Sequence, residues 1–538
     1  MKISADAFEA FLKCSTKCWL RAAGEQSPAN AYAECVKSQN QSYCADAAKR
    51  VIADVPANEC EIAPVAENLK TAKWRLAVGV ELCMPFETRM YKHVGSGGIP
   101  PPDNSLIVPC SPAKLDGSLS ALPSLVTCLH AIERVPSAGR GKPAQFIPIR
   151  FIFSNKLTKD DRLLLAFDAL TLSVALGRQI VVGQIIHGED HATLKVRTPA
   201  LAGEVRKRLG KIAALLSSPT PPDLVLNRHC AECDFQTRCR KEAIEKDDLS
   251  LLAGMSEKER KKLHSKGIFT ATQLSYAFRP RRRPKRLRDK REKYHHSLKA
   301  LAIREKKIYI VGSPQLKIEG TPVYLDVEGL PDRDFYYLIG VRIGNGTSAV
   351  QHSLWADSVE DEGRIWRELL GILETIEKPV IIHYGSYETT FLRRMSERHG
   401  KPPKGSVVAA TIEAAVNLLS VIFAQVYYPC HSNGLKEIAK HLGFRWSAST
   451  ATGMGTIVGH QEWESSRAAA AKEALLIYNA EDCQALEVVL NCLLELCRVS
   501  SQIGDSPSGD VVNTAHLKWE HPYGFKKKIR SPSRNWMS

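Results

Sequence analysis

Two acidic residues stand inside an apolar run in the C-terminal half of the chain, and this run constrains the fold most. Residues 323 to 327, Val-Tyr-Leu-Asp-Val, have the β-branched and aromatic composition of a buried central strand, and Glu328 follows them directly. Because side chains alternate along a strand, Asp326 and Glu328 point to the same face. Carboxylates on a buried strand need a partner, and divalent metal ions shared by both residues would supply one.

Further elements follow this strand in a definite order. Turn residues separate runs rich in β-branched and aromatic residues, and helical periodicity marks the later segments. Strands are expected at Phe335 to Ile343, Ala349 to Trp355 and Pro379 to Tyr384, and helices at Val359 to Ile376, Tyr387 to His399, Leu435 to Leu442 and Ala468 to Cys497. The Ala/Ser/Gly-rich stretch from Ser447 to Gly459 is expected to be a surface loop. Three strands, a helix, a strand and then helices is the order of an RNase H-like α/β sheet.

Two more acidic residues accompany the first pair. Asp482 lies on the long predicted helix with Tyr478 four residues earlier, so the carboxylate and the phenol share one helix face. Glu388 lies after the fourth strand, at the start of the next helix. Phosphodiester cleavage by two metal ions needs several carboxylates that converge on ions about 3.5–4 Å apart.

This constellation resembles the DEDD exonuclease superfamily, the DnaQ-like branch of the RNase H-like fold, over residues 321 to 500. The motifs of that family are Asp-x-Glu on the first strand, an aromatic-Asp pair after the fourth strand and Tyr-x-x-x-Asp on a late helix. The matching residues are Asp326 with Glu328, Tyr387 with Glu388, and Tyr478 with Asp482. The resemblance implies a 3′–5′ exonuclease in which the four acidic residues hold Mg²⁺ or Mn²⁺ and Tyr478 assists catalysis. Glu388 departs from the Asp usual in the family, and its extra methylene shifts the ligand. Two neighbours are candidates for auxiliary roles: His383 in acid/base chemistry and Lys436 in holding a substrate phosphate.

Cysteines form a second candidate site in the N-terminal half. Cys230, Cys233 and Cys239 give the spacing Cys-x2-Cys-x5-Cys, three soft ligands within ten residues that call for a fourth. Cys14 and Cys18 are the distant candidates for that position. Four thiolates suit either zinc or an iron–sulfur cluster.

One remote and three clustered cysteines resemble the iron–sulfur nucleases of the RecB-like PD-(D/E)XK superfamily, in which the cluster joins the two ends of the nuclease fold. The resemblance implies a [4Fe-4S] cluster, with zinc as the alternative, and its best-matching ligands are Cys14, Cys230, Cys233 and Cys239. The superfamily's catalytic Asp and Glu-x-Lys are not intact here. His130 stands where the Asp is expected, and residues 147 to 151 contain no acid-x-Lys. We therefore expect a degenerate site, in which Asp116 and Glu133 are the remaining candidates for metal ligands.

Positive charge is concentrated in two segments. The net charge is +16, of which the fifteen residues from Arg279 to Lys293 contribute +8 and the tail from Ala515 contributes +5. Concentrated Lys and Arg neutralise phosphates, so a nucleic acid is the expected partner. DNA is preferred to RNA as that partner, and the charge by itself does not distinguish them. The candidate contacts, besides Lys436, are Arg279, Arg281, Arg282, Arg283, Lys285 and Arg286. A solvated linker or a localisation signal is the other interpretation of the run.

Together these features predict a multidomain α/β protein that resembles a RecB-like putative nuclease family of bacteria. We expect a RecB-like PD-(D/E)XK domain at residues 1–247, a helix-hairpin-helix-like and basic linker at 248–320, an RNase H-like domain at 321–500 and a basic tail at 501–538. The first domain should contain several short strands and one strongly apolar helix, Arg162 to Leu176. The chain begins with acidic residues where a signal peptide would be apolar and has no run of ~20 apolar residues, so we expect a cytoplasmic protein without a membrane span. A non-catalytic iron–sulfur adaptor that binds nucleic acid is the alternative function, and protein partners cannot be inferred.

Overall fold

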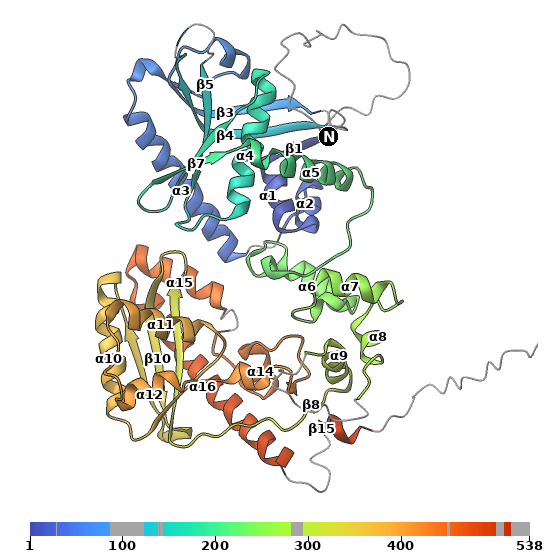
Figure 1. Ribbon diagram of the computed structural model, residues 1–538, viewed down its shortest axis with the longest axis vertical. Coiled ribbons are helices and arrows are strands. Elements are labelled where there is room, and N and C mark those ends of the chain that lie inside the picture. Colours follow the sequence, from blue (N-terminus) through green and yellow to red (C-terminus); the bar gives the residue numbers. More distant parts are fainter. Residues whose placement is uncertain are drawn as a thin grey trace, which may run out of the picture. The chain divides into compact units, whose positions relative to one another are not determined.

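The computed structural model describes residues 1–27, 30–86, 123–137, 139, 144–280, 294–448, 452–501 and 510–517 (Figure 1). The chain forms two compact units, Met1–Cys239 and Arg240–Ser538. Asp116, the basic residues at 281–293 and the tail from residue 518 lie outside the described residues. No helix among the described residues combines the length and the apolar character needed to cross a membrane.

The N-terminal unit is built on a mixed seven-stranded sheet. Its strands run in the order β2-β3-β4-β5-β6-β7, and β1 pairs with β4. The strands are β1 (Lys2–Ser4), β2 (Cys60–Ile62), β3 (Leu76–Pro85), β4 (Ser124–Val135), β5 (Gln145–Ile152), β6 (Val182–His187) and β7 (Ala192–Arg197). The expected mixed α/β architecture is present, but β3 and β4, with 10 and 12 residues, exceed the short strands that we predicted. Polar residues such as Thr127 and His130 interrupt the apolar pattern of β4 and hide its full length.

Helix α4 (Lys159–Leu176) is the apolar helix expected at Arg162 to Leu176. Thr158 and Asp161 form a capping box at its start, and Gly177 ends it in the left-handed region at φ 69°. The residues from Leu163 to Leu172 are all buried, because one side of α4 packs on the sheet and the other on further helices. The other helices are α1 (Ala5–Lys13), α2 (Ser15–Ala22), α3 (Ala31–Ala53), α5 (Pro199–Leu216) and α6 (Gln236–Glu245), of which α6 crosses the division between the units.

Short helices follow in the region predicted to resemble a helical hairpin. Helices α7 (Glu257–His264) and α8 (Ala271–Ser275) flank a turn in which Gly267 has φ 76°. Helix α9 (His296–Glu305) follows, and a small core that includes Leu249, Leu274 and Ala300 joins α8 to α9. Two short helices joined by a turn therefore lie within the linker predicted at residues 248–320.

The C-terminal unit contains a five-stranded sheet in the order β11-β10-β9-β12-β13. Strand β10 is antiparallel to both β9 and β11, whereas β12 is parallel to β9 and β13 is parallel to β12. The strands are β9 (Thr321–Leu330), β10 (Phe335–Ile343), β11 (Val350–Trp355), β12 (Pro379–His383) and β13 (Val416–Asn417). Each of the four strands predicted between residues 323 and 384 is present.

Helices cover both faces of this sheet (Figure 1). Val323, Leu325 and Val327 pack with α10 (Glu362–Glu374) and α11 (Tyr387–His399) in one core. Tyr324 belongs to the other core, with α14 (Leu435–His441) and the 33-residue helix α16 (Ala469–Ser501). Since side chains alternate along β9, Asp326 and Glu328 lie on the same face as Tyr324, the face that α16 covers.

The surface loop predicted from Ser447 to Gly459 is wrong in its second half, where helix α15 (Gly453–Ser466) begins. Thr452 caps its first turn, and Thr456, His460 and Trp463 are buried at helical spacing. This buried face stabilises a helix that its three glycines disfavour. The remaining elements are α12 (Val407–Glu413), α13 (Leu418–Ile422) and a small sheet of β8 (Ile308–Ile310), β14 (Val426–Tyr427) and β15 (Val511–Asn513).

Candidate active site

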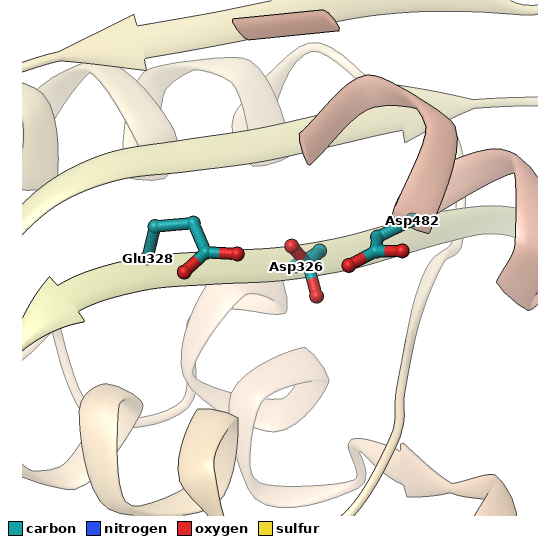
Figure 2. Close-up of side chains that lie close together, drawn as sticks. All are labelled: Asp326, Glu328 and Asp482. Atoms are coloured by element: carbon teal, nitrogen blue, oxygen red, sulfur yellow. The ribbon is translucent and has the colours of Figure 1, made fainter. Parts of the chain in front are cut away.

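Three carboxylates converge where α16 crosses β9. Asp326 and Glu328 come from the strand and Asp482 from the helix, and each offers an oxygen within 4.8 Å of the others. Figure 2 shows the side chains of Glu328 and Asp482 pointing toward Asp326 from either side. Within the described parts of the chain, no other group of three His, Cys, Asp or Glu ligand atoms is this compact. Carboxylate oxygens are the hard ligands that Mg²⁺ and Mn²⁺ prefer.

Each of these carboxylates accepts a hydrogen bond from a neutral donor. Asn479 Nδ2 donates to Asp326 Oδ2 at 2.7 Å, and Thr456 Oγ1 donates to Glu328 Oε2 at 2.9 Å. The indole Nε1 of Trp446 donates to Asp482 Oδ1 at 2.7 Å. A neutral donor orients a carboxylate without neutralising it, so the negative charges remain available to a cation.

Burial raises the pKa of all three carboxyl groups. It is the largest cause of the rise for Asp326, and the charges of Asp482, Glu328 and Glu388 add to it. Burial also raises the pKa of Glu328 to about 8, and it raises that of Asp482, although the positive charge of Lys436 opposes both increases. A cation between the carboxylates would favour their ionised forms, so these residues fit a divalent metal ion.

The fourth predicted acidic residue, Glu388, lies beside the compact trio rather than in it. It is buried at the start of α11, and its charge raises the pKa of Asp326 and Glu328. Its Oε2 makes no hydrogen bond to a described residue and lies 3.6 Å from Nδ1 of the buried His383. The adjacent Tyr387 packs edge-on against Tyr336. A buried carboxylate oxygen without a hydrogen-bond donor is a further observation that fits a cation at this site.

Tyr478 and Lys436 meet next to Asp482. Lys436 Nζ donates a hydrogen bond to the Tyr478 hydroxyl and lies 4.0 Å from the centroid of its ring. Tyr478 is also hydrogen-bonded to Asp482, one helical turn away on α16. The structure thus brings together two residues that lie 42 positions apart in the chain.

A glycine allows α16 to approach the strand that carries Asp326. Gly340 pairs directly with Asp326 across β9 and β10. A Cβ atom at this position would lie 2.1 Å from Asn479 Oδ1 and 3.0 Å from Cys483 Sγ. Sequence reasoning missed Gly340, Asn479, Thr456 and Trp446. The signal that was available for Asn479 is its place next to Tyr478 on the predicted helix, whereas no local pattern marks the others.

Residues 323–494 match the family model of the RNase H superfamily. The match runs from β9 into α16 and contains the three converging carboxylates. The C-terminal part of this protein is an RNase H-like domain. Such domains suggest a nuclease-type phosphodiester hydrolase acting on a nucleic acid. No curated protein matches the chain.

A buried ion pair joins the sheet of the N-terminal unit to α4, and the described residues of this unit contain no compact acidic cluster. Arg150 on β5 binds Asp168 on α4 through Nε at 2.9 Å and Nη2 at 3.2 Å, and Thr127 Oγ1 donates to Asp168 at 2.7 Å. His130, at the expected position of a ligating Asp, accepts the backbone N–H of Phe151 at 2.9 Å. Burial, together with the charge of Arg150, lowers the pKa of His130 to about 3, so this ring is a neutral structural group. Glu133 accepts a hydrogen bond of 3.4 Å from Gln184 and belongs to no compact acidic group among the described residues.

The four predicted cysteine ligands line a single pocket of the same unit. The pocket is lined by Cys14, Cys230, Cys233 and Cys239, and Cys18 is absent from its lining. Cys18 is instead completely buried in the apolar core between α1, α4 and α5. Asp234 joins the cysteine segment to α2 by ion pairs with Lys17 at 3.1 Å and Arg21 at 2.8 Å.

Proposed function

We propose that this protein is a metal-dependent nuclease that removes nucleotides from the 3′ end of a DNA strand. The convergence of Asp326, Glu328 and Asp482 within an RNase H-like domain carries the proposal. These three residues would hold Mg²⁺ or Mn²⁺, and Glu388 would complete the set of four acidic residues from α11. When bound, divalent ions would activate water and stabilise the leaving oxygen of the phosphodiester.

The residues around the carboxylates would supply orientation. Asn479 and Thr456 donate hydrogen bonds to Asp326 and Glu328 and would keep these carboxylates oriented to hold the metal ion. Tyr478, whose hydroxyl accepts a hydrogen bond from Lys436, would orient the attacking water. Lys436 would bind a phosphate oxygen of the substrate, because its positively charged ammonium group lies close to the carboxylates and would attract the negatively charged phosphate.

A cleavage assay tests this function. DNA and RNA strands labelled at either end are incubated with the full chain and Mg²⁺ or Mn²⁺. We expect stepwise shortening of DNA from its 3′ end, and its loss in Asp326→Asn and in Asp482→Asn. Glu133→Gln is the matched control in the N-terminal unit and should cleave normally. Undiminished cleavage by both Asp variants would overturn the assignment, and tight binding without any cleavage would favour the adaptor function.

For the N-terminal unit, we propose a PD-(D/E)XK-like domain that binds nucleic acid through a degenerate site and holds a [4Fe-4S] cluster. The Arg150–Asp168 ion pair supports the loss of catalysis, because it neutralises a buried carboxylate of this unit. Cys14, Cys230, Cys233 and Cys239 support the cluster, because they line one pocket. No three of these thiols lie within 4.8 Å of one another. Four sulfurs bound to one zinc at about 2.3 Å would lie roughly 3.8 Å apart. In an iron–sulfur cluster each thiolate binds a different iron, so the sulfurs lie farther apart.

Metal analysis of anaerobically purified protein tests the cluster. We expect a brown protein with broad visible absorbance and stoichiometric iron and sulfide. Cys14→Ser should lose the colour and lower the unfolding temperature of the N-terminal unit, because the ligands join its two ends. Cys18→Ser, four residues away, is the matched control and should keep the colour. Stoichiometric zinc without iron would overturn the iron–sulfur assignment.

A further inference from the structure

An aromatic residue with no assigned role lies at the edge of the acidic trio. Trp446 follows α14 and is half-buried, and its indole N–H donates to Asp482 Oδ1. The backbone N–H of the next residue, Ser447, donates to Glu481 Oε1 at 2.8 Å. These two bonds tie the segment to adjacent residues of α16. The indole ring is therefore held in place beside the carboxylates.

Positive charge surrounds this ring. The ammonium groups of Lys436 and Lys440 lie 5.6 and 6.0 Å from its centroid, within the range of cation–π attraction. Arg445, which directly precedes Trp446, is exposed, and its Nη1 donates to the backbone oxygens of Lys440 and Phe444, both at 2.8 Å. Neither Lys440 nor Arg445 forms an ion pair with any residue that the structure describes, so their charges are available to a ligand.

The combination of a fixed aromatic ring and available cations has a specific chemical use. Single-stranded nucleic acids bind to proteins by stacking bases on aromatic side chains while basic residues contact the phosphates. A carboxylate cluster alone repels a phosphodiester, so a strand that reaches it needs cations beside it. Lys440, in the last turn of α14 with its Nζ 6.0 Å from the ring centroid, and Arg445, the residue before Trp446, supply such cations.

We propose that Trp446, Lys440 and Arg445 form a subsite for one nucleotide of the substrate strand. The base stacks on the indole ring, and Lys440 and Arg445 bind the phosphate. The indole N–H also makes Trp446 a positioning residue for Asp482, so one hydrogen bond links the ring that binds the strand to a carboxylate that would hold the metal ion. This inference rests on the proposed nuclease function and adds where the strand lies in the site.

Two substitutions at Trp446 separate its two roles. Trp446→Phe keeps an aromatic ring but removes the N–H donor, so the KM for a single strand should stay within about twofold while kcat and Mn²⁺ affinity fall. Trp446→Ala removes both, and KM should also rise by roughly 5- to 150-fold, the range expected for one stacked base. Mn²⁺ affinity is measured without substrate by electron paramagnetic resonance. An unchanged KM in Trp446→Ala, or an equal rise in KM in both variants, would overturn the stacking role.

The phosphate contacts are tested by removing both exposed charges. In Lys440→Ala/Arg445→Ala, single-strand affinity should fall and its salt dependence should flatten by about 1.4 units, at roughly 0.7 per contact. The double substitution of the exposed Lys401 and Lys404, in the loop after α11, removes the same charge elsewhere in the domain and should bind normally. An equal loss in both double variants would indicate a general charge effect and overturn the subsite.

Strand binding is measured by fluorescence anisotropy in the Asp326→Asn background, which needs no cleavage. If the wild-type chain cleaves nothing, the proposed function fails, but this binding measurement still tests the subsite. If the wild-type chain cleaves and Trp446→Ala binds the strand normally, the subsite fails by itself. Circular dichroism confirms folding, and the exposed Lys440/Arg445 variant remains informative if Trp446→Ala does not fold.

Discussion

Gly340→Ala should disturb the active site from a strand that carries none of its acidic residues. The new Cβ would lie 2.1 Å from Asn479 Oδ1, and ordinary van der Waals contact begins at 3.4 Å, so the two atoms must separate by about 1.3 Å. The Asn479 side chain has little freedom to turn away, because its Nδ2 donates to both the carboxylate and the backbone oxygen of Asp326 at 2.7 and 3.1 Å. Either these bonds break or α16 moves outward with Asp482.

Both responses have measurable consequences. Overpacking a core in this way costs about 1–3 kcal/mol of folding free energy, which lowers the unfolding temperature of a domain of this size by roughly 2–12 °C. A catalytic group misplaced by ~1 Å costs on the order of 100-fold in rate. Calorimetry on the full chain measures the first effect, and cleavage of a labelled strand at saturating Mg²⁺ measures the second.

Two comparisons test whether the close contact between residue 340 and Asn479 causes these effects. Gly371 lies on α10, and a Cβ added there would meet nothing within 4 Å, so Gly371→Ala should instead stabilise the domain by about 0.5–1 kcal/mol. In an Asn479→Ala background the two nearest atoms are gone and Cys483 Sγ at 3.0 Å remains, so the cost of Gly340→Ala should fall. Normal stability and normal cleavage in Gly340→Ala would show that α16 does not need a glycine at this position. A cost unchanged by Asn479→Ala would show that Asn479 is not the obstacle.

Three further predictions concern charge. Burial raises the pKa of Glu328 from 4.5 to about 8, so the folded metal-free protein binds an extra proton between these pH values and loses stability as the pH rises through them. The unfolding temperature should fall over this pH range, and Mg²⁺ should stabilise the protein more at pH 8 than at pH 6. Glu328→Gln should flatten this dependence of the unfolding temperature on pH. Asp168→Asn leaves the buried Arg150 without its charged partner and should lower the free energy of unfolding of the N-terminal unit by about 3–5 kcal/mol, measured by calorimetry. A loss of cleavage by the folded variant would instead indicate that the N-terminal unit is the nuclease. Replacing the three arginines at 281 to 283 by Ala should weaken DNA binding and flatten its salt dependence by roughly two to three units, whereas normal binding would make the run a solvated linker.

Features that depend on neighbours in the chain could be predicted from the sequence alone. The alternation along residues 323 to 328 places Asp326 and Glu328 on one face of a strand. The four-residue spacing of Tyr478 and Asp482 places these two residues on one face of a helix. The order of strands and helices from residue 321 onward followed from the same local periodicities. Each of these patterns is a property of one segment, so it can be read without knowing what the segment packs against.

Which side chains meet at the site depends on how distant segments pack. Trp446, Thr456 and Asn479 each donate to a carboxylate 36 to 153 positions away, and the contacts exist because α14 and α15 both pack against α16, which crosses β9. The spacing allowed both Cys14 and Cys18, with Cys14 preferred by the resemblance, and the structure encloses Cys18 in the core of α1, α4 and α5 while Cys14 lines the pocket. Helix α15 replaced half of a predicted loop for the same reason, since burial of His460 and Trp463 outweighs the poor helix propensity of its glycines. Contacts between distant segments depend on the packing of the whole domain, which no local pattern contains.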